Sequence, residues 1–520
     1  MSAALVVYLF LSPSCPMSER YRPDVERLRA DFPAVRFEEP PGPIHGARVT
    51  PSVVVTQGGR VRYRGRIDDR SPSLGIYRAP VRQDLREALE ALLAGKPVPT
   101  PETAAVGCAI SVSSPKQDAA ITFAKHVAPI LFQHCAPCHR DLTSHQASAS
   151  RAAAIAEVTR RRIMPPWKPD PGPPHFIGAR RLTDAQIRLI GQWAADGAPL
   201  GSPADLPPVP QFRDGWQLPD PDMVVRMPTP FEVPAGGDDI YTCVVVPLKL
   251  SATRYVRAFE FRPGNARVMH HALLFLDASG VARRRGTSYP CFGVPGFLPT
   301  ASLGGWTPGF TASEYPPRTA VTLRPGMDLV LQLHYHPVGR AESDQSELAL
   351  YFTDSPPTRR MMAVALGSRI IDIAPGVRRH VVRDHFTLPV PVEVTGIIPH
   401  AHYICREMRG VAILPGGKRV TLITIRDWDF NWQQHFRYAQ PFTLPADTRL
   451  EMEFVYDNSD TNPRNPARPA RRVQWGPDST DEMAGLHVQV VPANDEDARE
   501  LGQSLWGKIM RDLGGGILRR

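Results

Sequence analysis

Apolar and polar positions alternate in different ways along the chain, and the changes in pattern mark out its parts. Up to about residue 108, short apolar runs that predict strands alternate with longer amphipathic stretches that predict helices. Strands are expected at Leu5–Leu11 and in a hairpin of Val53–Val55 with Val61–Ile67, and helices at Met17–Asp31 and Val81–Leu93. This mixture predicts an α/β domain over residues 1–110.

Beyond this domain the helical and the strand-like patterns separate. Ile121–Cys135 and Asp184–Ala195 predict helices, so residues 119–200 are expected to form a small all-α domain. A polar linker at 111–118 precedes it and a proline-rich linker at 201–218 follows it. Strand-like segments then continue to about residue 493, and the tail, 494–520, has a helical stretch followed by Gly514–Gly516.

The composition limits which kinds of protein this chain can be. A chain of 520 residues has room for several domains, and its 56 prolines, about twice the usual share, favour β domains and stiff linkers over long helices. The lysines and arginines behind the net charge of +9 are dispersed and are not interleaved with aromatic residues, so no nucleic-acid-binding patch is expected. No run of 18 apolar residues occurs, so no transmembrane segment is expected.

Histidines recur on strand-like segments in the second half of the chain. His270 and His271 are adjacent in an apolar stretch, and His334 lies in the alternating segment Leu331–Tyr335. Neutral imidazole is the commonest side-chain metal ligand, although a hydrogen-bonded pair at a strand end is the alternative for His270 and His271. Adjacent residues of a regular strand point to opposite faces, so these two can bind one ion only where the backbone bulges or turns.

A second group of candidate ligands follows. His400 and His402 are two residues apart on a strand, so their side chains share a face and can close on one ion. Met483 stands at the head of another strand-like segment, and a thioether together with imidazole favours Cu(I). Two copper sites are therefore hypothesised, one of His270, His271 and His334 and one of His400, His402 and Met483.

The order of these motifs resembles that of the copper type II, ascorbate-dependent monooxygenases, the family of peptidylglycine α-hydroxylating and dopamine β-monooxygenases. The likeness covers roughly residues 220–493, with His-His, Leu-Gln-Leu-His-Tyr, His-x-His and Asp-Glu-Met in sequence. It implies two all-β sandwich (jelly-roll-like) domains, 219–360 and 361–493, each holding one copper. The three-histidine copper would store and pass an electron, and the His/His/Met copper would bind O2 and hydroxylate a C–H bond. The likeness also implies a disulfide between Cys243 and Cys291, while Cys405 has no obvious partner.

The substrate-binding residues of that family are not matched. Its peptide-hydroxylating members have an Arg two residues before His-x-His, where this chain has Ile398. They also have an Asn and a Tyr after the copper Met, where this chain has Gly485 and His487. Neither a peptidylglycine nor a catecholamine substrate is therefore expected, and a small neutral or apolar molecule is favoured. Four other histidines are interpreted as structural or surface residues: His336, His380, His385 and His435.

The helical region carries Cys135-Ala-Pro-Cys138-His139, the attachment signature of a c-type haem. Cys135 and Cys138 would form thioethers to the haem, and His139 would be the axial ligand. A zinc site is an alternative, but no second cysteine pair completes it. Met164, on a proline-stiffened loop like that of some cytochrome c domains, is the expected sixth ligand, and His175 is the runner-up.

The N-terminal domain resembles the thioredoxin-like redoxins. Cys15 lies at the first strand-to-helix turn, Ser18 is expected to cap the following helix, and Pro51 is expected to follow a cis peptide bond. The second cysteine of Cys-x-x-Cys is missing, and the segment between Phe37 and Pro51 is too short for the usual central strand and helix. The domain is interpreted either as a degenerate docking module or as a redox module in which Cys108 pairs with Cys15.

These motifs together predict an exported, periplasmic copper monooxygenase that contains two copper ions and one covalent haem c. An external donor, either a redox protein or a small reductant, would reduce the haem, which would pass single electrons to the coppers. Copper and haem c chemistry requires export, and because Ala3–Leu11 reads poorly as a signal peptide, a leader is expected upstream of this sequence. One alternative is an electron-transfer or copper-binding protein without hydroxylase activity, and another is a thiol peroxidase in the N-terminal domain.

Overall fold

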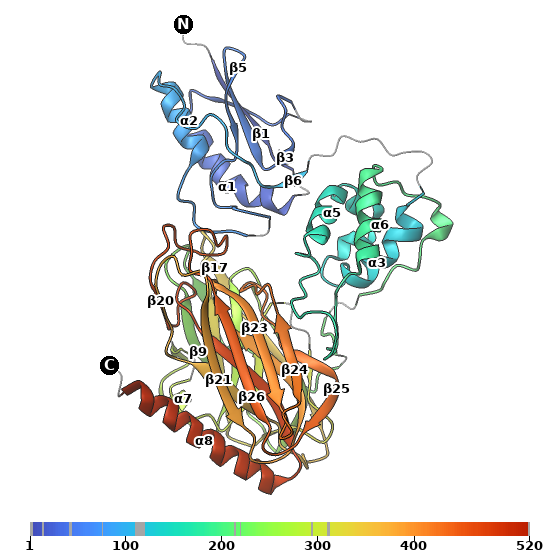
Figure 1. Ribbon diagram of the computed structural model, residues 1–520, viewed down its shortest axis with the longest axis vertical. Coiled ribbons are helices and arrows are strands. Elements are labelled where there is room, and N and C mark those ends of the chain that lie inside the picture. The colour runs from blue at the N-terminus through green and yellow to red at the C-terminus, as the bar shows by residue number, and fades with distance from the viewer. Residues whose placement is uncertain are drawn as a thin grey trace. The chain divides into compact units, whose positions relative to one another are not determined.

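The structure is a computed structural model that describes residues 4–12, 15–40, 44–74, 76–109, 120–212, 215–218, 220–292, 295–308 and 312–517. The chain forms two compact units, one of Met1–Trp167 with Arg180–Phe212 and the other of Lys168–Ala179 with Arg213–Arg520. Most of the regular structure is β-sheet, arranged in several sheets, and helices are few (Figure 1). None of the helices in the described ranges is both long and apolar enough to cross a bilayer. The linker predicted at 111–118 lies outside the described residues.

The first unit begins with a four-stranded sheet in the order β2-β1-β4-β5. Strand β1 runs parallel to β2 and antiparallel to β4, which turns back into β5 as the predicted hairpin. Val7 and Leu9 of β1 are buried together with Val53 and Val55 of β4 and with apolar residues of both helices. The elements are β1 (Leu5–Phe10), α1 (Pro16–Asp31), β2 (Arg36–Glu38), β3 (Val49–Thr50), β4 (Ser52–Gln57), β5 (Arg60–Gly65), α2 (Asp84–Leu93) and β6 (Cys108–Ala109).

Two details of this part differ from the sequence prediction. Ser18 does not cap α1, because the helix already begins at Pro16 with Cys15 in the capping position. The Ser18 hydroxyl is buried and hydrogen-bonds Thr50 Oγ1 at 2.6 Å. Helix α2 begins at Asp84, three residues later than predicted, because the backbone N–H groups at 81 and 82 donate to a carboxylate oxygen of Asp69. The cis peptide bond predicted before Pro51 is confirmed.

The helical part of the first unit packs around Trp193 and Phe123, both fully buried. The helix predicted at 121–135 is present as a π-helical turn, Phe123–Val127, that continues into α3 (Ala128–His134). Helix α6 (Asp184–Ala195) matches its prediction, because Thr183 and Gln186 form a capping box that fixes its start. The remaining helices are the 3₁₀ turn Arg140–Thr143, α4 (His145–Ala149), α5 (Ala152–Arg160) and the 3₁₀ turn Pro203–Asp205.

Two five-stranded sheets form the first half of the second unit. Their orders are β14-β10-β18-β7, with β15 beside β10, and β12-β9-β16-β11-β13. Alternate residues of both sheets, such as Phe259 and Leu274, fill one shared core, as in a β-sandwich. The predicted disulfide between Cys243 and Cys291 is present. The elements are β7 (Met223–Arg226), β8 (Phe231–Val233), β9 (Ile240–Pro247), β10 (Arg254–Arg262), β11 (Met269–Asp277), α7 (Val281–Arg284), β12 (Ser288–Pro290), β13 (Ala301–Trp306), β14 (Ser313–Glu314), β15 (Val321–Leu323), β16 (Asp328–Tyr335), β17 (Glu342–Asp344) and β18 (Glu347–Thr353).

The second half of this unit contains two four-stranded sheets, β19-β28-β22-β25 and β21-β26-β23-β24. They pack closely, because a Cβ on Gly410 of β23 would come within 2.8 Å of Leu486 on β28. Helix α8 continues through the glycines at which it was expected to end, and its Lys508 pairs with Asp384 of β21. The elements are β19 (Met362–Ser368), β20 (Asp372–Ile373), β21 (His380–Thr387), β22 (Val392–His400), β23 (Cys405–Ile413), β24 (Arg419–Ile425), β25 (Phe436–Leu444), β26 (Arg449–Tyr456), β27 (Val473–Gln474), β28 (Ala484–Pro492) and α8 (Asp495–Ile517).

Candidate metal centres

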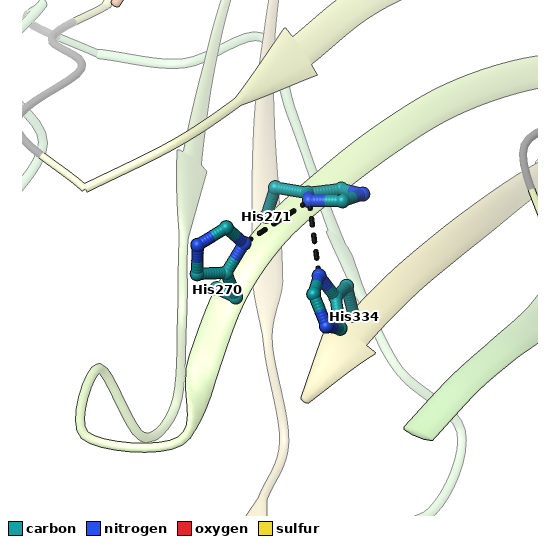
Figure 2. Close-up of side chains that lie close together, drawn as sticks. All are labelled: His270, His271 and His334. Carbon is teal, nitrogen blue, oxygen red and sulfur yellow. Dashed lines mark hydrogen bonds between the residues drawn. The ribbon is translucent and has the colours of Figure 1, made fainter. Parts of the chain in front are cut away.

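Three histidines meet at the paired ends of β11 and β16. His271 lies directly opposite His334, and the register shifts between Met269 and His271, which is the bulge that two adjacent ligands require. The Nδ1 atom of His271 lies 3.3 Å from Nδ1 of His270 and 3.2 Å from Nδ1 of His334. Figure 2 shows the three rings turned toward one another. The structure therefore brings together the three residues that the sequence predicts as ligands of one ion.

The protonation of these rings suits a metal. Burial, followed by the charge of neighbouring histidines, lowers the pKa of both His270 and His271 well below the usual value, so both are neutral at pH 7. A neutral imidazole nitrogen has one in-plane hydrogen-bonding direction, so Nδ1 of His271 can satisfy only one of its two close neighbours. One nitrogen from each ring lies within 4.8 Å of the others, so a single cation could use all three.

A carboxylate that the sequence did not reveal lies behind His334. Asp239 Oδ2 is 3.1 Å from Nε2 of His334, and its Oδ1 is 2.6 Å from Nδ1 of His336. Burial raises the pKa of Asp239, but the contacts with these two rings outweigh burial and lower it. The two atoms are in electrostatic contact without a hydrogen bond, and a carboxylate at this distance favours the tautomer of His334 that carries its proton on Nε2 and leaves the Nδ1 lone pair for a metal. His336, predicted to be structural, thus shares Asp239 with a candidate ligand.

The second histidine pair lies at the end of β22. His400 pairs with Gly485 of β28, and His402 follows two residues later. Burial lowers the pKa of His400 to about 4 and that of His402 to about 3, so both rings are neutral. Nδ1 of His400 lies 2.6 Å from the side-chain oxygen of Gln433, and Nδ1 of His402 lies 3.3 Å from the carbonyl oxygen of Asp481. Because both partners accept hydrogen bonds, both rings carry their proton on Nδ1 and keep Nε2 free for a metal.

Glu482 connects this pair to Met483. One carboxylate oxygen of Glu482 accepts the backbone N–H groups of His402 at 2.9 Å and Met483 at 3.1 Å, and the other accepts that of Ile404 at 2.8 Å. The backbones of His402 and Met483 are therefore held against one carboxylate. Glu482 is fully buried, and burial raises its pKa to about 8. The sequence placed Met483 near these histidines but gave no role to the residue before it.

The loop between β24 and β25 also contacts both histidine groups, which the sequence prediction missed. The Phe430 ring stacks on that of His270, with centroids 4.5 Å apart, and lies 5.5 Å from that of His402. Gln433 donates from its amide nitrogen to the carbonyl of Phe430, which turns its oxygen toward His400. Trp428 donates from its indole nitrogen to the carbonyl of His402 at 3.2 Å. No periodic pattern marks this loop in the sequence, so only its contacts with the histidines in the folded structure reveal its role.

The haem signature lies at the end of α3. The carbonyl of Cys135 accepts the backbone N–H groups of both Cys138 and His139, so one turn brings all three residues together. The two thiols are free, and Cys138 and His139 are exposed. Met164 is partly exposed and lines a pocket with Trp167, Leu182 and Ile187. His175, the runner-up ligand, belongs to the second unit, where its carbonyl accepts the N–H of Ala439.

Comparisons with known proteins add no functional information. No family model matches the chain, and no curated protein matches it. Among solved structures, an uncharacterised conserved protein from Geobacillus kaustophilus is 22% identical, with 22% of this chain and 80% of that one covered and a TM-score of 0.16. The major capsid protein P2 of bacteriophage PM2 is 9% identical, with 52% and 97% covered and a TM-score of 0.25. The VP2 subviral particle of infectious bursal disease virus is 9% identical, with 54% and 75% covered and a TM-score of 0.16.

Proposed function

We propose that the protein is a copper-dependent monooxygenase that uses O2 to hydroxylate a C–H bond of a small neutral or apolar molecule. The observation that carries the proposal is the convergence of three Nδ1 atoms, from His270, His271 and His334, in a group that is joined through the Phe430 ring to a second pair of neutral histidines. The order of motifs that resembles the copper type II monooxygenases supports the same function.

The proposal assigns two copper ions to these residues. The first would be held by His270, His271 and His334, and the second by His400, His402 and Met483. Copper in the first site would supply one-electron transfer, and copper in the second would supply O2 activation. The chain contributes oriented ligands: the hydrogen bond with Gln433 holds the proton of His400 on Nδ1, and the charge of Asp239 favours the proton of His334 on Nε2.

A covalent haem is the proposed source of single electrons. Cys135 and Cys138 would bind it, with His139 and Met164 as axial ligands, and it would serve as a reversible one-electron carrier. Two free thiols and an exposed imidazole on one helical turn support this assignment. We further propose that the four-stranded sheet with α1 and α2 is a shortened thioredoxin-like domain that lacks the second cysteine of Cys-x-x-Cys. The Cys243–Cys291 disulfide supports an exported, oxidising location.

A second candidate function is electron transfer or copper binding without hydroxylation. Ile398 and Gly485 stand where the resembling enzymes carry polar substrate-binding residues, and this loss favours the second candidate. The two functions differ in oxygen chemistry. A hydroxylase consumes O2 in step with the appearance of a hydroxylated product, whereas a carrier undergoes redox change without a coupled product.

The deciding experiment begins with the whole chain, expressed behind a signal peptide in a host that matures c-type haem. We expect two coppers and one haem per chain in the unaltered protein. Met483→Ala should weaken copper binding at one site, and Cys138→Ala should lose the haem. The reduced, loaded protein is then screened with small neutral molecules for O2 uptake coupled to product. Haem without copper would remove the monooxygenase proposal, and two coppers without coupled uptake would favour the electron-transfer function.

A further inference from the structure

Two cysteines meet in the first unit, outside the candidate sites described above. Cys15 occupies the N-capping position of α1, and Cys108 begins β6. Strand β6 pairs antiparallel with β3, which sets Cys108 directly opposite Thr50, the residue before the cis peptide bond of Pro51. Cys15 approaches the same residue, with its Sγ 3.3 Å from the Thr50 carbonyl oxygen. Thr50 is therefore the point at which the two cysteines meet.

The two cysteine side chains pack in one cluster, although 92 residues separate them along the chain. Cys15 lies in an apolar cluster with the buried side chains of Met17 and Leu74, against which Tyr77 and Cys108 pack. Both cysteines are free thiols in this structure. Contact between two thiols in an apolar setting is the arrangement from which a disulfide forms without a large movement of the chain.

The residue before Cys108 is suited to this contact. A Cβ on Gly107 would lie 2.2 Å from the carbonyl oxygen of Thr50 and 3.0 Å from the nitrogen of Pro51. Any side chain at this position would push β6 away from β3. Glycine therefore allows the approach that brings Cys108 to Cys15.

The sulfur atoms of Cys15 and Cys108 differ in their tendency to ionise and in their exposure to solvent. The hydrogen bond from Cys108 lowers the pKa of Cys15 to about 6, against the effect of burial and with help from the backbone N–H of Ser18 at the helix N-terminus. The same hydrogen bond and burial raise the pKa of Cys108. The other groups that face the pair are Tyr77, whose pKa burial raises, and Arg20, whose guanidinium lies over the Tyr77 ring. Cys15 is only 1% exposed, whereas Cys108 is partly exposed.

We propose that Cys15 and Cys108 form a redox-active pair that oxidises the dithiol of a redox partner, and that the partner attacks Cys108. A partner thiolate attacks Sγ of Cys108 in the disulfide, forming a mixed disulfide, and Cys15 leaves as a thiolate. The second partner thiol, as a thiolate, then attacks the partner's own sulfur and releases Cys108, which takes up a proton. The partner dithiol becomes a disulfide, and two electrons pass to the cysteine pair. The Cys15–Cys108 disulfide is formed again by exchange with a small-molecule disulfide, which takes up the two electrons and leaves as two thiols.

Two properties indicate that the partner attacks Cys108 and not Cys15: the solvent exposure of each sulfur and the stability of the thiolate that leaves. The partly exposed Cys108 can be reached by an incoming thiolate, while the buried Cys15 cannot be reached without opening the cluster. Thiol–disulfide exchange is faster when the departing sulfur is a stabilised thiolate, which describes Cys15. This inference is independent of the copper and haem proposals.

The test uses the full-length chain in dithiothreitol buffers of defined redox ratio. Thiols are trapped by alkylation and assigned by peptide mapping, and Cys405→Ala serves as the control because Cys405 is a buried free thiol in the other unit. We expect Cys15 and Cys108 to change together from two free thiols to one disulfide. Gly107→Val, which keeps both thiols but displaces β6, should lose this change. Two thiols that stay reduced at every ratio, or Gly107→Val that still forms the disulfide, would overturn the pairing.

The site of attack is tested separately with glutathione. The oxidised protein is mixed with reduced glutathione and quenched in acid, and the mixed disulfide is mapped. Cys15→Ser and Cys108→Ser are also treated with oxidised glutathione, with circular dichroism to check that both are folded. We expect the adduct on Cys108 and at least tenfold faster capture in Cys15→Ser than in Cys108→Ser. An adduct mapped to Cys15, or equal capture rates, would contradict the proposed direction.

Discussion

The phenyl ring of Phe430 stacks on the imidazole of His270, with centroids 4.5 Å apart and 21° between their planes. The two residues come from different halves of the second unit, because His270 belongs to β11 and Phe430 to the loop between β24 and β25. The same ring lies 5.5 Å from that of His402. One aromatic side chain therefore contacts a candidate ligand from each of the two metal sites.

This shared ring leads to a first prediction. Phe430→Leu should leave all six proposed copper ligands in place but remove the aromatic contacts, which contribute about 1 kcal/mol beyond the burial of apolar area. We expect two coppers still bound, a lower free energy of unfolding of the second unit and slower electron exchange between the sites. Copper analysis, denaturant unfolding and rapid-mixing reduction measure the three quantities. Electron exchange as fast as in the unaltered protein would show that the ring is only structural.

A second prediction concerns the carboxylate behind the three-histidine site. Asp239→Asn should lower copper affinity at that site roughly 10–100-fold, because an amide cannot hold the proton of His334 on Nε2 as firmly as a carboxylate does. Competition with a Cu(I) chelator measures the affinity. His385→Gln is the matched control, since His385 is exposed on β21. Equal affinity in Asp239→Asn and the control would contradict this role of Asp239.

A third prediction tests the hydrogen bonds through which the Glu482 carboxylate holds the backbone at the second copper site. Above about pH 8, where Glu482 is ionised, Glu482→Gln replaces one accepting carboxylate oxygen with a donor, so at least one of the backbone N–H groups of His402, Ile404 and Met483 loses its partner. An unsatisfied buried donor costs about 1–3 kcal/mol, and we expect this loss in the free energy of unfolding together with weaker copper binding at His400 and His402. Glu407→Gln, on the exposed side of β23, should change neither quantity. Unchanged stability and copper binding in Glu482→Gln would rule out this role of Glu482.

A fourth prediction is the pH dependence of Cys15. Its pKa of about 6 lies below the usual value of 9.0, so ionisation of Cys15 stabilises the reduced fold. This contribution is complete above about pH 9 and is lost as the pH falls through 6. Thiolate absorbance of the reduced protein should therefore include a step near pH 6 that is missing in Cys15→Ser. In Cys108→Ala the step should move to higher pH, because the hydrogen bond from Cys108 is the largest cause of the shift. A step that stays near pH 6 in Cys108→Ala would contradict that cause.

The sequence by itself predicted the main elements and the candidate ligands. Period-two alternation identified the strands that carry His334 and His400, and α6 begins at Asp184 as predicted, where the structure shows a capping box of Thr183 and Gln186. These features depend on local geometry, which neighbouring residues fix. The sequence also predicted that His270 and His271 can bind one ion only where the strand bulges, and the bulge is present.

Tertiary structure alone decided which residues support those ligands. Asp239, Phe430 and Glu482 contact residues far from them in the sequence. No local pattern distinguishes Asp239 or Phe430 from other acidic or aromatic residues, and the Asp-Glu-Met motif that contains Glu482 does not reveal its contact with His402. The meeting of Cys15 with Cys108 likewise depends on Gly107 fitting against Thr50, a contact between strands that only the folded sheet creates. Protonation states follow the same rule, because burial and hydrogen-bond partners, both products of the fold, set the charge of each buried side chain.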